Sequence, residues 1–325
     1  MDPHSSTTSF KLPDWTKKTL FLFVMVFALD SFCYKAGFPL FDKMNHFGKM
    51  NQRADILILG SSNILWAIDS EELSAGLQKK VDMFSLAGGT MEFRYYFLKD
   101  YLDKHKENPP KLILFHTDRF AFNKKRYGDE SYKSLQGYYH SGLFREYLNY
   151  KWQGSFDSYM KKLFRSYSLN SEAYFIYSKM FDKLPITLAL VSPLYSQETN
   201  QSGTPPEESK IEDWKKLYGD PKEFLDFDEG FVKHFELSVE LMKKYPEVQF
   251  LLLETPMIEL FDESLFDPTR NYFRGAEASH IKYVYINDER FKTDERLYYD
   301  ASHFNLIGRN FYTSELKKYL EKFLQ

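Results

Sequence analysis

Short apolar runs alternate with longer amphipathic stretches along most of this chain. The run Asp55–Leu59 is apolar after its first residue and stops at Gly60, a pattern typical of a strand that is buried on both faces. Four later runs of similar length and composition also predict strands: Val81–Leu86, Lys111–His116, Val248–Glu254 and Tyr283–Ile286.

Between these runs, apolar residues recur at the spacing of one helix face. One helix is predicted to begin at Asp69 or Ser70, with acidic residues in its first turn. Others are predicted over Thr90–Lys104, Gly230–Tyr245 and Leu306–Phe323. This alternation predicts an α/β domain of three layers, in which helices cover both faces of a doubly wound, mainly parallel five-stranded sheet.

The domain is expected to run from residue 55 to residue 325, and its pattern changes within residues 128–228. Aromatic-rich segments there predict a helical insertion, which we expect to lie over the carboxyl edge of the sheet. Its predicted helices are Leu143–Trp152, Phe156–Phe164 and Ala173–Phe181, and Ser196–Lys210 is expected to form a polar surface loop.

The N-terminus combines a polar leader, residues 1–18, with an apolar segment, residues 19–36. Lys17 and Lys18 precede the apolar segment, and positive charge at this place favours a secretory signal or a signal anchor whose leader stays in the cytoplasm. Asp30 interrupts the segment, whose apolar run Thr19–Tyr34 is short against the about 20 residues that a spanning helix prefers.

No pair of small residues closes the apolar segment as a signal-peptide cleavage site would require, so we expect an uncleaved transmembrane anchor rather than a cleaved signal. The alternative is an amphipathic or core helix of a cytosolic protein, and the two lysines weigh against it. An anchor predicts a single-pass protein of a bacterial cell membrane whose C-terminal domain is periplasmic or extracellular.

Composition narrows the class of function. The net charge is only −3, and the chain shows no excess of basic residues of the kind that nucleic-acid binding requires. Cys33 is the only cysteine, which excludes an intrachain disulfide and a cysteine-rich zinc site. Four histidines, His105, His140, His234 and His280, have no carboxylate or cysteine partner at a metal-binding spacing. We therefore expect no metal and no other cofactor.

In an open α/β sheet, ligands bind at the carboxyl ends of the strands, where loops from several elements converge. Four predicted strands end in loops that carry polar residues, and a fifth polar segment precedes the last helix. These segments are Gly60–Asn63, Ala87–Thr90, His116–Arg119, Glu254–Pro256 and Asp300–Asn305. Within them, His116 is as consistent with a packed histidine as with a site residue, and Asp118 and Arg119 are expected to pair with each other.

Ser62, His303 and Asp300 are the candidate catalytic residues. Ser62 follows the first strand, and a serine hydroxyl becomes a good nucleophile only when a neighbouring base takes its proton. His303 is the candidate base, and Asp300 lies close enough before it to orient the imidazole. Taken alone, Ser62 is typical of a helix N-cap. The joint order of the three residues along the chain favours a catalytic site.

Donors near Ser62 would stabilise the negative charge of an acyl-transfer intermediate. The backbone N–H groups of Ser62 and of a glycine after the second strand are candidates, together with a side chain from the third loop. An anionic aspartate would be a poor donor unless it is protonated. The candidate oxyanion and substrate-binding residues are Asn63, Gly88, Gly89, Thr117 and Asp118.

These motifs resemble those of the SGNH (GDSL-type) hydrolase superfamily. The resemblance covers the scaffold from about residue 55 to the C-terminus, without the insertion. Ser62 in Leu59-Gly60-Ser61-Ser62 matches the family nucleophile, and Gly88 or Gly89 matches its oxyanion glycine. Asp300-Ala301-Ser302-His303 matches the final block that supplies aspartate and histidine.

The chain departs from the family pattern in two blocks. Ser61 stands where aspartate is usual, and Thr117 or Asp118 stands where the third block has asparagine. With the membrane anchor, these departures resemble a divergent branch that includes the D-alanyl-transfer protein of teichoic acid modification and the alginate O-acetylation proteins.

The resemblance implies a flavodoxin-like fold and a serine esterase or O-acyltransferase. Its substrate would be an acylated glycan or lipid of the cell envelope, and other envelope acyl-transfer proteins would be its partners. The alternative is a catalytically silent protein of the same fold that binds an envelope partner.

Overall fold

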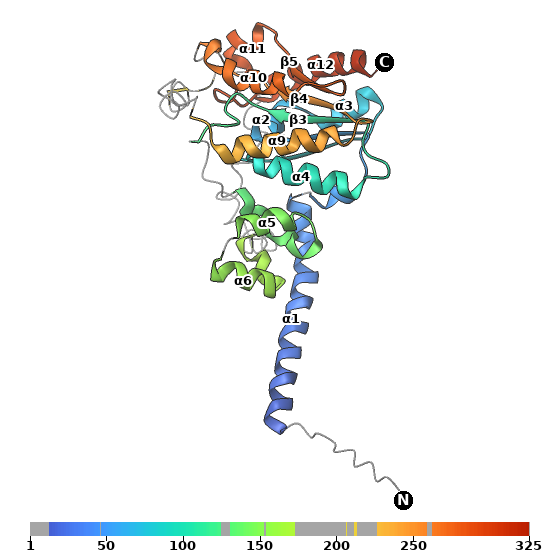
Figure 1. Cartoon of the computed structure of the whole chain (residues 1–325), viewed down its shortest axis with the longest axis vertical. Coiled ribbons are helices and arrows are strands. Elements are labelled where there is room, and N and C mark those ends of the chain that lie inside the picture. The colour runs from blue at the N-terminus through green and yellow to red at the C-terminus, as the bar shows by residue number, and fades with distance from the viewer. Residues whose placement is uncertain are drawn as a thin grey trace, which may run out of the picture.

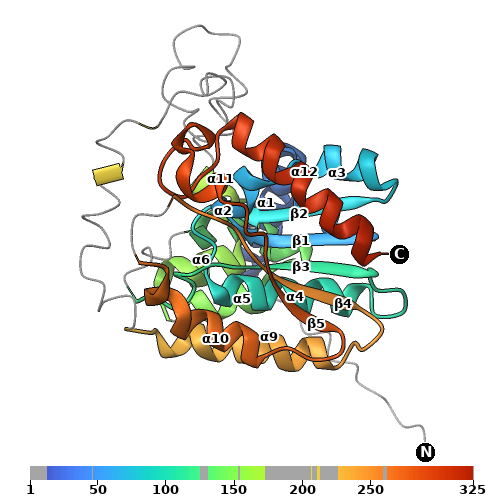
Figure 2. The same cartoon turned by 90° about the horizontal axis from the view of Figure 1, so that it is seen from above.

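The computed structural model of the protein describes residues 13–45, 47–124, 131–152, 154–172, 206, 211–212, 226–258 and 262–324. Within these residues, the centre is a sheet of five strands in the order β2-β1-β3-β4-β5 (Figure 2). Neighbouring strands are parallel throughout, which confirms the predicted parallel α/β sheet. The strands are β1 (Ile56–Ser61), β2 (Val81–Leu86), β3 (Leu112–Thr117), β4 (Gln249–Glu254) and β5 (Ile281–Tyr285).

Helices cover both faces of this sheet (Figure 1, Figure 2). One face is covered by α4 (Met91–Lys104) and α9 (Glu229–Lys243). The other face is covered by α2 (Ser62–Ala67), α3 (Ser70–Leu77) and α12 (Leu306–Phe323). The result is the three-layer arrangement that the alternation of strands and helices predicted.

The position of β1 in the middle of the protein explains why its sequence is apolar from Ile56 to Leu59. Side chains alternate between the two faces of a strand. Leu57 and Leu59 pack into the core beneath α4 and α9, and Ile56 and Ile58 pack into the core beneath α12. Because both faces are buried, an apolar residue is needed at each position from Ile56 to Leu59, whereas the buried Ser61 at the end of the strand contacts His116.

Side-chain caps set the starts of two of the predicted helices. The Asp69 carboxylate accepts the backbone N–H groups of Glu71 and Glu72 at the start of α3, and Asn305 accepts the Gly308 N–H at the start of α12. The remaining elements of the domain are short: η1 (Phe47–Asn51), η6 (Glu263–Phe266), α10 (Asp267–Gly275), α11 (Arg290–Thr293) and η7 (Glu295–Leu297).

The described part of the insertion is helical, as predicted. It comprises η2 (Ser131–Ser141), α5 (Arg145–Lys151), α6 (Phe156–Leu163) and η3 (Ser166–Glu172). The predicted helix Ala173–Phe181 lies outside the described residues, and so does the predicted loop Ser196–Lys210 apart from residue 206.

The position of these segments differs from the expectation. They pack on the outer side of α4 and along α1 rather than over the carboxyl edge of the sheet (Figure 1). Phe144 carries the contact with α4, because its ring lies 6.1 Å from that of Phe93 and its backbone N–H donates to Asp100 at 2.8 Å. Aromatic residues of the insertion therefore extend the core below α4, and this packing accounts for many of the aromatic residues in these segments.

Helix α1 (Asp14–Asn45) is longer than the predicted apolar segment and projects from the domain (Figure 1). Residues 14–39 are long and apolar enough to cross a membrane, a property that signal sequences share. The last turns pack into the domain, where Tyr34 donates to the Gly137 carbonyl at 3.0 Å and Phe41 is fully buried. A single helix thus connects an exposed apolar stretch to the core.

Gly308 provides a test of the packing between α12 and the segment before it. A Cβ at Gly308 would lie 2.0 Å from the Leu297 carbonyl oxygen and 2.5 Å from Phe304 Cδ1. We expect Gly308→Ala to lower the free energy of unfolding by about 1–3 kcal/mol, because backbone must move to admit the methyl group. The measurement is the midpoint of urea or thermal unfolding.

Gly275→Ala is the matched control, because a Cβ at this helical position meets nothing within 4 Å. Its midpoint should be unchanged or slightly raised, since alanine favours the helical state. A Gly308→Ala protein as stable as the wild type would contradict the close approach of α12 to Leu297.

Candidate active site

Ser62 lies at the carboxyl edge of the sheet, where β1 passes directly into α2. The turn is tight at Gly60, where a Cβ would lie 2.4 Å from Ile64 Cγ2 and 2.7 Å from His116 Cβ. Ser61 has extended backbone angles and is fully buried, whereas Ser62 is partly exposed. Because neighbouring side chains of an extended segment point to opposite sides, Ser62 is the serine that is presented at this edge.

Asp300 organises the polar segment before α12. Its Oδ1 accepts the backbone N–H groups of Ser302 at 2.8 Å and His303 at 2.9 Å. The Tyr299 N–H donates to the His303 carbonyl at 2.8 Å, which closes the turn from the other side. Asn305 then caps α12. These local bonds hold His303 against Asp300.

The structure brings Ser62, His303 and Asp300 together. His303 Nε2 lies 2.9 Å from Ser62 Oγ, and His303 Nδ1 lies 2.8 Å from Asp300 Oδ2 and 3.0 Å from Oδ1. A carboxylate only accepts hydrogen bonds, so Nδ1 carries the imidazole proton and Nε2 accepts the Ser62 hydroxyl. This is the contact that the sequence predicted, and the catalytic roles of the three residues stay a prediction.

Asp300 is held in its charged form. Burial acts to raise the pKa of its carboxyl, but the hydrogen bond from His303, the charge of His303 and the two backbone N–H groups together outweigh burial. The pKa of Asp300 is therefore lower than that of an ordinary aspartate. A charged Asp300 keeps the Nδ1 proton in place and would stabilise the imidazolium that forms when His303 takes a proton.

An aromatic pair flanks the three residues. The rings of Trp66 and Tyr299 are stacked, with centroids 5.7 Å apart, and the Trp66 ring centroid lies 6.1 Å from that of His303. Trp66 is four residues after Ser62 in α2, so the two side chains share one helix face. Both rings are partly exposed. Together they give one side of the site an aromatic surface.

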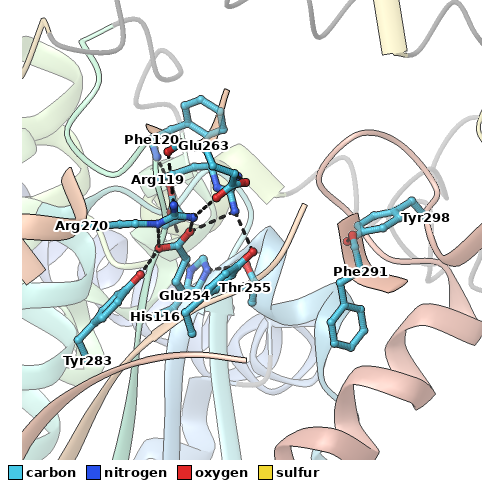
Figure 3. A network of polar contacts seen from close by, with 12 residues as sticks. His116, Arg119, Phe120, Glu254, Thr255, Glu263, Arg270, Tyr283, Phe291 and Tyr298 are labelled. Carbon is cyan, nitrogen blue, oxygen red and sulfur yellow. Dashed lines mark hydrogen bonds and ion pairs between the residues drawn. The ribbon is translucent and has the colours of Figure 1, made fainter. Parts of the chain in front are cut away.

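The surroundings of His116 decide whether it is a packed histidine or a site residue. It is fully buried at the end of β3, with Nδ1 3.3 Å from Ser61 Oγ and Nε2 3.1 Å from Thr255 Oγ1. Figure 3 shows its contact with Thr255 beneath the carboxyl ends of the strands. His116 is thus a packed histidine that links β1, β3 and β4.

The expected pair between Asp118 and Arg119 is wrong. Asp118 pairs with the fully buried Arg94 of α4, at 3.2 Å, and its other oxygen accepts the Phe120 N–H. Arg119 turns to the other side and pairs with Glu254 at 3.2 Å and Glu263 at 2.7 Å. Asp118 and Arg119 are neighbours in the sequence, but their side chains point in different directions from the end of β3. Each therefore pairs with residues of different elements.

Sequence reasoning missed the charged cluster around Arg119 (Figure 3). Glu254, fully buried at the end of β4, accepts two hydrogen bonds from Arg270, at 2.8 and 3.1 Å, and another from the Tyr283 hydroxyl. Glu263 pairs with both arginines. Two positive and two negative groups balance, which buried charges require. In the sequence, the only indication of this cluster was Glu254, a charged residue at the end of an apolar strand.

The candidate oxyanion residues differ in whether their polar groups already have hydrogen-bond partners within the protein. The Gly89 N–H donates to the Leu86 carbonyl at 2.8 Å, and Asp118 is an ion-paired acceptor. Thr117 Oγ1 is enclosed, with no hydrogen-bond partner among the described residues. Gly88 is partly exposed and has a φ of 68°, which glycine adopts without strain. Together with Asn63, which is buried beside Ser62, Gly88 is the remaining candidate.

In the described part of the chain, no group of three or more His, Cys, Asp or Glu side chains is placed to hold a metal ion. The groups that meet at the edge where Ser62 lies are a hydroxyl, an imidazole and a carboxylate. The absence of a cofactor stays a prediction.

The low pKa of Asp300 predicts a pH-dependent contribution to stability. Its carboxylate is charged and hydrogen-bonded in the folded state, so the contribution is present above the ordinary aspartate pKa of about 3.9 and is lost as pH falls through the lower folded value. We expect Asp300→Asn to melt at a lower temperature than the wild type at pH 7, by about 2–6 °C.

The difference between the two melting temperatures should shrink as pH falls below about 4, because the wild-type carboxyl then becomes neutral as well. Asp262→Asn is a comparison at an exposed carboxylate, whose pKa is also lowered, mainly by the Ser264 N–H. A pH-independent difference for Asp300→Asn would contradict a charged, hydrogen-bonded Asp300.

Comparisons with family models, with curated proteins and with solved structures gave no match for this chain. What the chain does must therefore be inferred from the residues at the carboxyl edge and from their geometry.

Proposed function

We propose that this protein is a membrane-anchored serine esterase or O-acyltransferase of SGNH-like fold, acting on an acylated glycan or lipid of the cell envelope. The observation that carries the proposal is the 2.9 Å contact between Ser62 Oγ and His303 Nε2, with Asp300 on the far side of the same imidazole. A nucleophile, a base and a group that orients the base are what covalent acyl transfer needs.

The reaction follows from this geometry. Ser62 Oγ attacks the carbonyl carbon of the ester while His303 Nε2 takes the hydroxyl proton. The tetrahedral intermediate collapses, His303 gives the proton to the leaving alcohol oxygen, and the acyl group stays on Ser62 as an ester. Water or an acceptor hydroxyl then gives its proton to His303 and attacks the acyl-enzyme, which releases an acid or a new ester and restores Ser62.

Two other groups assist these steps. The Asp300 carboxylate holds the Nδ1 proton, so that Nε2 is free to accept in each half of the reaction. The Gly88 N–H and Asn63 are the proposed donors to the oxyanion, because Gly89 and Asp118 have other partners.

The order of the strands supports an SGNH-like assignment. The order β2-β1-β3-β4-β5 is a common one for doubly wound sheets, whose ligands bind at the carboxyl edge where the chain reverses direction across the sheet, between β1 and β3. Ser62 follows β1 at that place, and His303 comes from the segment before the last helix. The anchor, the extracytoplasmic location, the envelope substrate and envelope acyl-transfer partners rest on α1 and on the resemblance of the motifs.

One observation favours a second candidate, a catalytically silent protein of the same fold that binds an envelope partner. The third strand offers an enclosed Thr117 and an ion-paired Asp118 at the place where the family has an asparagine donor. If Gly88 and Asn63 do not replace that donor, the oxyanion is left without adequate stabilisation. A direct test of turnover separates the two candidates.

Ser62→Ala should abolish hydrolysis of p-nitrophenyl acetate by the full-length protein, with a loss on the order of 10³-fold or more, because no acyl-enzyme can form. A fluorophosphonate probe should label the wild type and not the variant. Both readouts are to be taken on protein whose circular dichroism and melting temperature match those of the wild type.

Ser61→Ala is the matched control, since this adjacent hydroxyl contacts His116 rather than His303. It should keep fluorophosphonate labelling and most of the hydrolysis rate. Equal turnover by wild type and Ser62→Ala, or a wild type that neither turns over the ester nor reacts with the probe, would overturn the enzymatic proposal and support the silent candidate.

A further inference from the structure

Helix α6 has an apolar face that no described residue covers. Phe156, Tyr159 and Leu163 are 79%, 64% and 54% exposed. Their spacing of three and four residues places all three on one side of the helix. The opposite side is turned toward the protein, because Ser158 and Lys161 are buried. An exposed stripe of three large apolar side chains is unusual on a surface that faces water.

Helix α6 lies beside α1, at the level of the exposed apolar stretch of that helix (Figure 1). The Phe164 ring, directly after α6, stacks on the Phe27 ring of α1 with centroids 5.6 Å apart and an angle of 13° between the planes. Large apolar side chains of α1 are exposed from Leu20 to Phe32. The end of α6 therefore adjoins an apolar surface that extends along α1.

Asp30 of α1 binds the segment that follows α6. Its carboxylate accepts the backbone N–H groups of Arg165 at 2.8 Å and Ser166 at 2.9 Å, as well as the Ser166 hydroxyl. Asp30 is 9% exposed, so the acid that interrupts the apolar run of α1 is covered and hydrogen-bonded within the protein. A carboxylate at membrane depth is tolerated when it is satisfied in this way.

The depth of α6 can be estimated along α1. Phe27 contacts Phe164 and Asp30 binds the backbone of Arg165 and Ser166, so the end of α6 lies two to five residues before Phe32, or about 3–8 Å of helix rise. Among the side chains of α1 that the structure describes, Phe32 is the last large apolar one that is exposed, and the exposed Lys35 follows it. A helix that lies in a membrane interface places its apolar face about 5–10 Å below the headgroup boundary. The two ranges overlap.

We propose that α6 is an interfacial helix, whose Phe156, Tyr159 and Leu163 insert into the leaflet on the domain side of the membrane that α1 spans. The proposal rests on α1 being the membrane anchor. A single spanning helix leaves the domain free to rotate and tilt, whereas a second contact through α6 fixes its height and orientation above the lipid. The carboxyl edge with Ser62 is then held in a constant position relative to a membrane-bound substrate.

Site-directed spin labelling of the full-length chain tests this. In a Cys33→Ser background, Tyr159→Cys or Leu163→Cys receives a nitroxide label, and the protein is reconstituted into vesicles of phosphatidylethanolamine and phosphatidylglycerol. Collision of the label with oxygen, which concentrates in lipid, is compared with collision with a water-soluble nickel chelate. Both substitutions are at exposed positions, so the fold is not disturbed.

Labels at 159 and 163 should favour oxygen over the nickel chelate several-fold more than a label at Ile307→Cys, an exposed apolar position on α12. A label at Leu22→Cys reports on the anchor itself. If position 22 favours oxygen while 159 and 163 favour nickel, the interfacial helix is wrong and the anchor stands.

If positions 22, 159 and 163 all favour nickel, the proposed anchor fails together with the interfacial helix. If 159 and 163 are protected from both reagents and show spin–spin broadening between molecules, a second copy of the chain covers α6, and the proposal is overturned in favour of a dimer. Hydrolysis by Ser62 is measured separately, so neither result depends on catalytic activity.

Discussion

The parallel alignment of all neighbouring strands is the constraint on which the rest of the protein depends. Parallel strands end at one edge, and the loops that leave them meet there. Ser62 leaves β1 at that edge, and the segment from Asp300 to Asn305 passes it before α12 begins. Two residues 241 positions apart in sequence thereby come within 2.9 Å. Close packing of α2 on β1 at Gly60 and of α12 on Leu297 at Gly308 sets the positions of both partners.

The same edge holds many buried charged and polar groups, which form a layer of hydrogen bonds and ion pairs beneath the partly exposed Ser62 and His303. His116, Ser61 and Thr255 form a hydrogen-bonded link across β1, β3 and β4, and Arg94 with Asp118 ties β3 to α4. Buried charges destabilise a fold unless they are paired, so each of these groups depends on its neighbours. Ser62 and His303 lie above this layer and are partly exposed. Of the three candidate catalytic residues, Asp300 is the charged one.

The described part of the insertion and the end of α1 share one continuous hydrophobic core with α4 and the sheet. Phe144 packs on α4, Phe41 of α1 is buried in the same core, and Asp30 binds the backbone at Ser166. Helix α1 continues without a break from its exposed apolar stretch into the core, so no flexible linker separates the two. The extended core also explains why so many aromatic residues lie outside the sheet.

The sequence by itself determined the features that depend on local pattern. Apolar runs predicted five strands, caps such as Asp69 marked a helix start, and the Asp300-Ala301-Ser302-His303 block predicted a base next to its carboxylate. Each of these depends on residues within one turn or one strand. Ser62 was also predictable, because a serine after a buried strand must lie at the edge of the sheet.

Tertiary structure alone decided which distant groups meet. The partners of Asp118 and Arg119 come from α4, β4 and η6, and no spacing in the sequence reveals which direction each side chain takes. The same holds for His116, for the insertion beside α1 and for the loss of Asp118 and Gly89 as donors. Local periodicity reports whether a residue is buried, whereas the identity of its neighbours depends on how whole elements pack. For this reason the candidate triad could be predicted from the sequence and its surroundings could not.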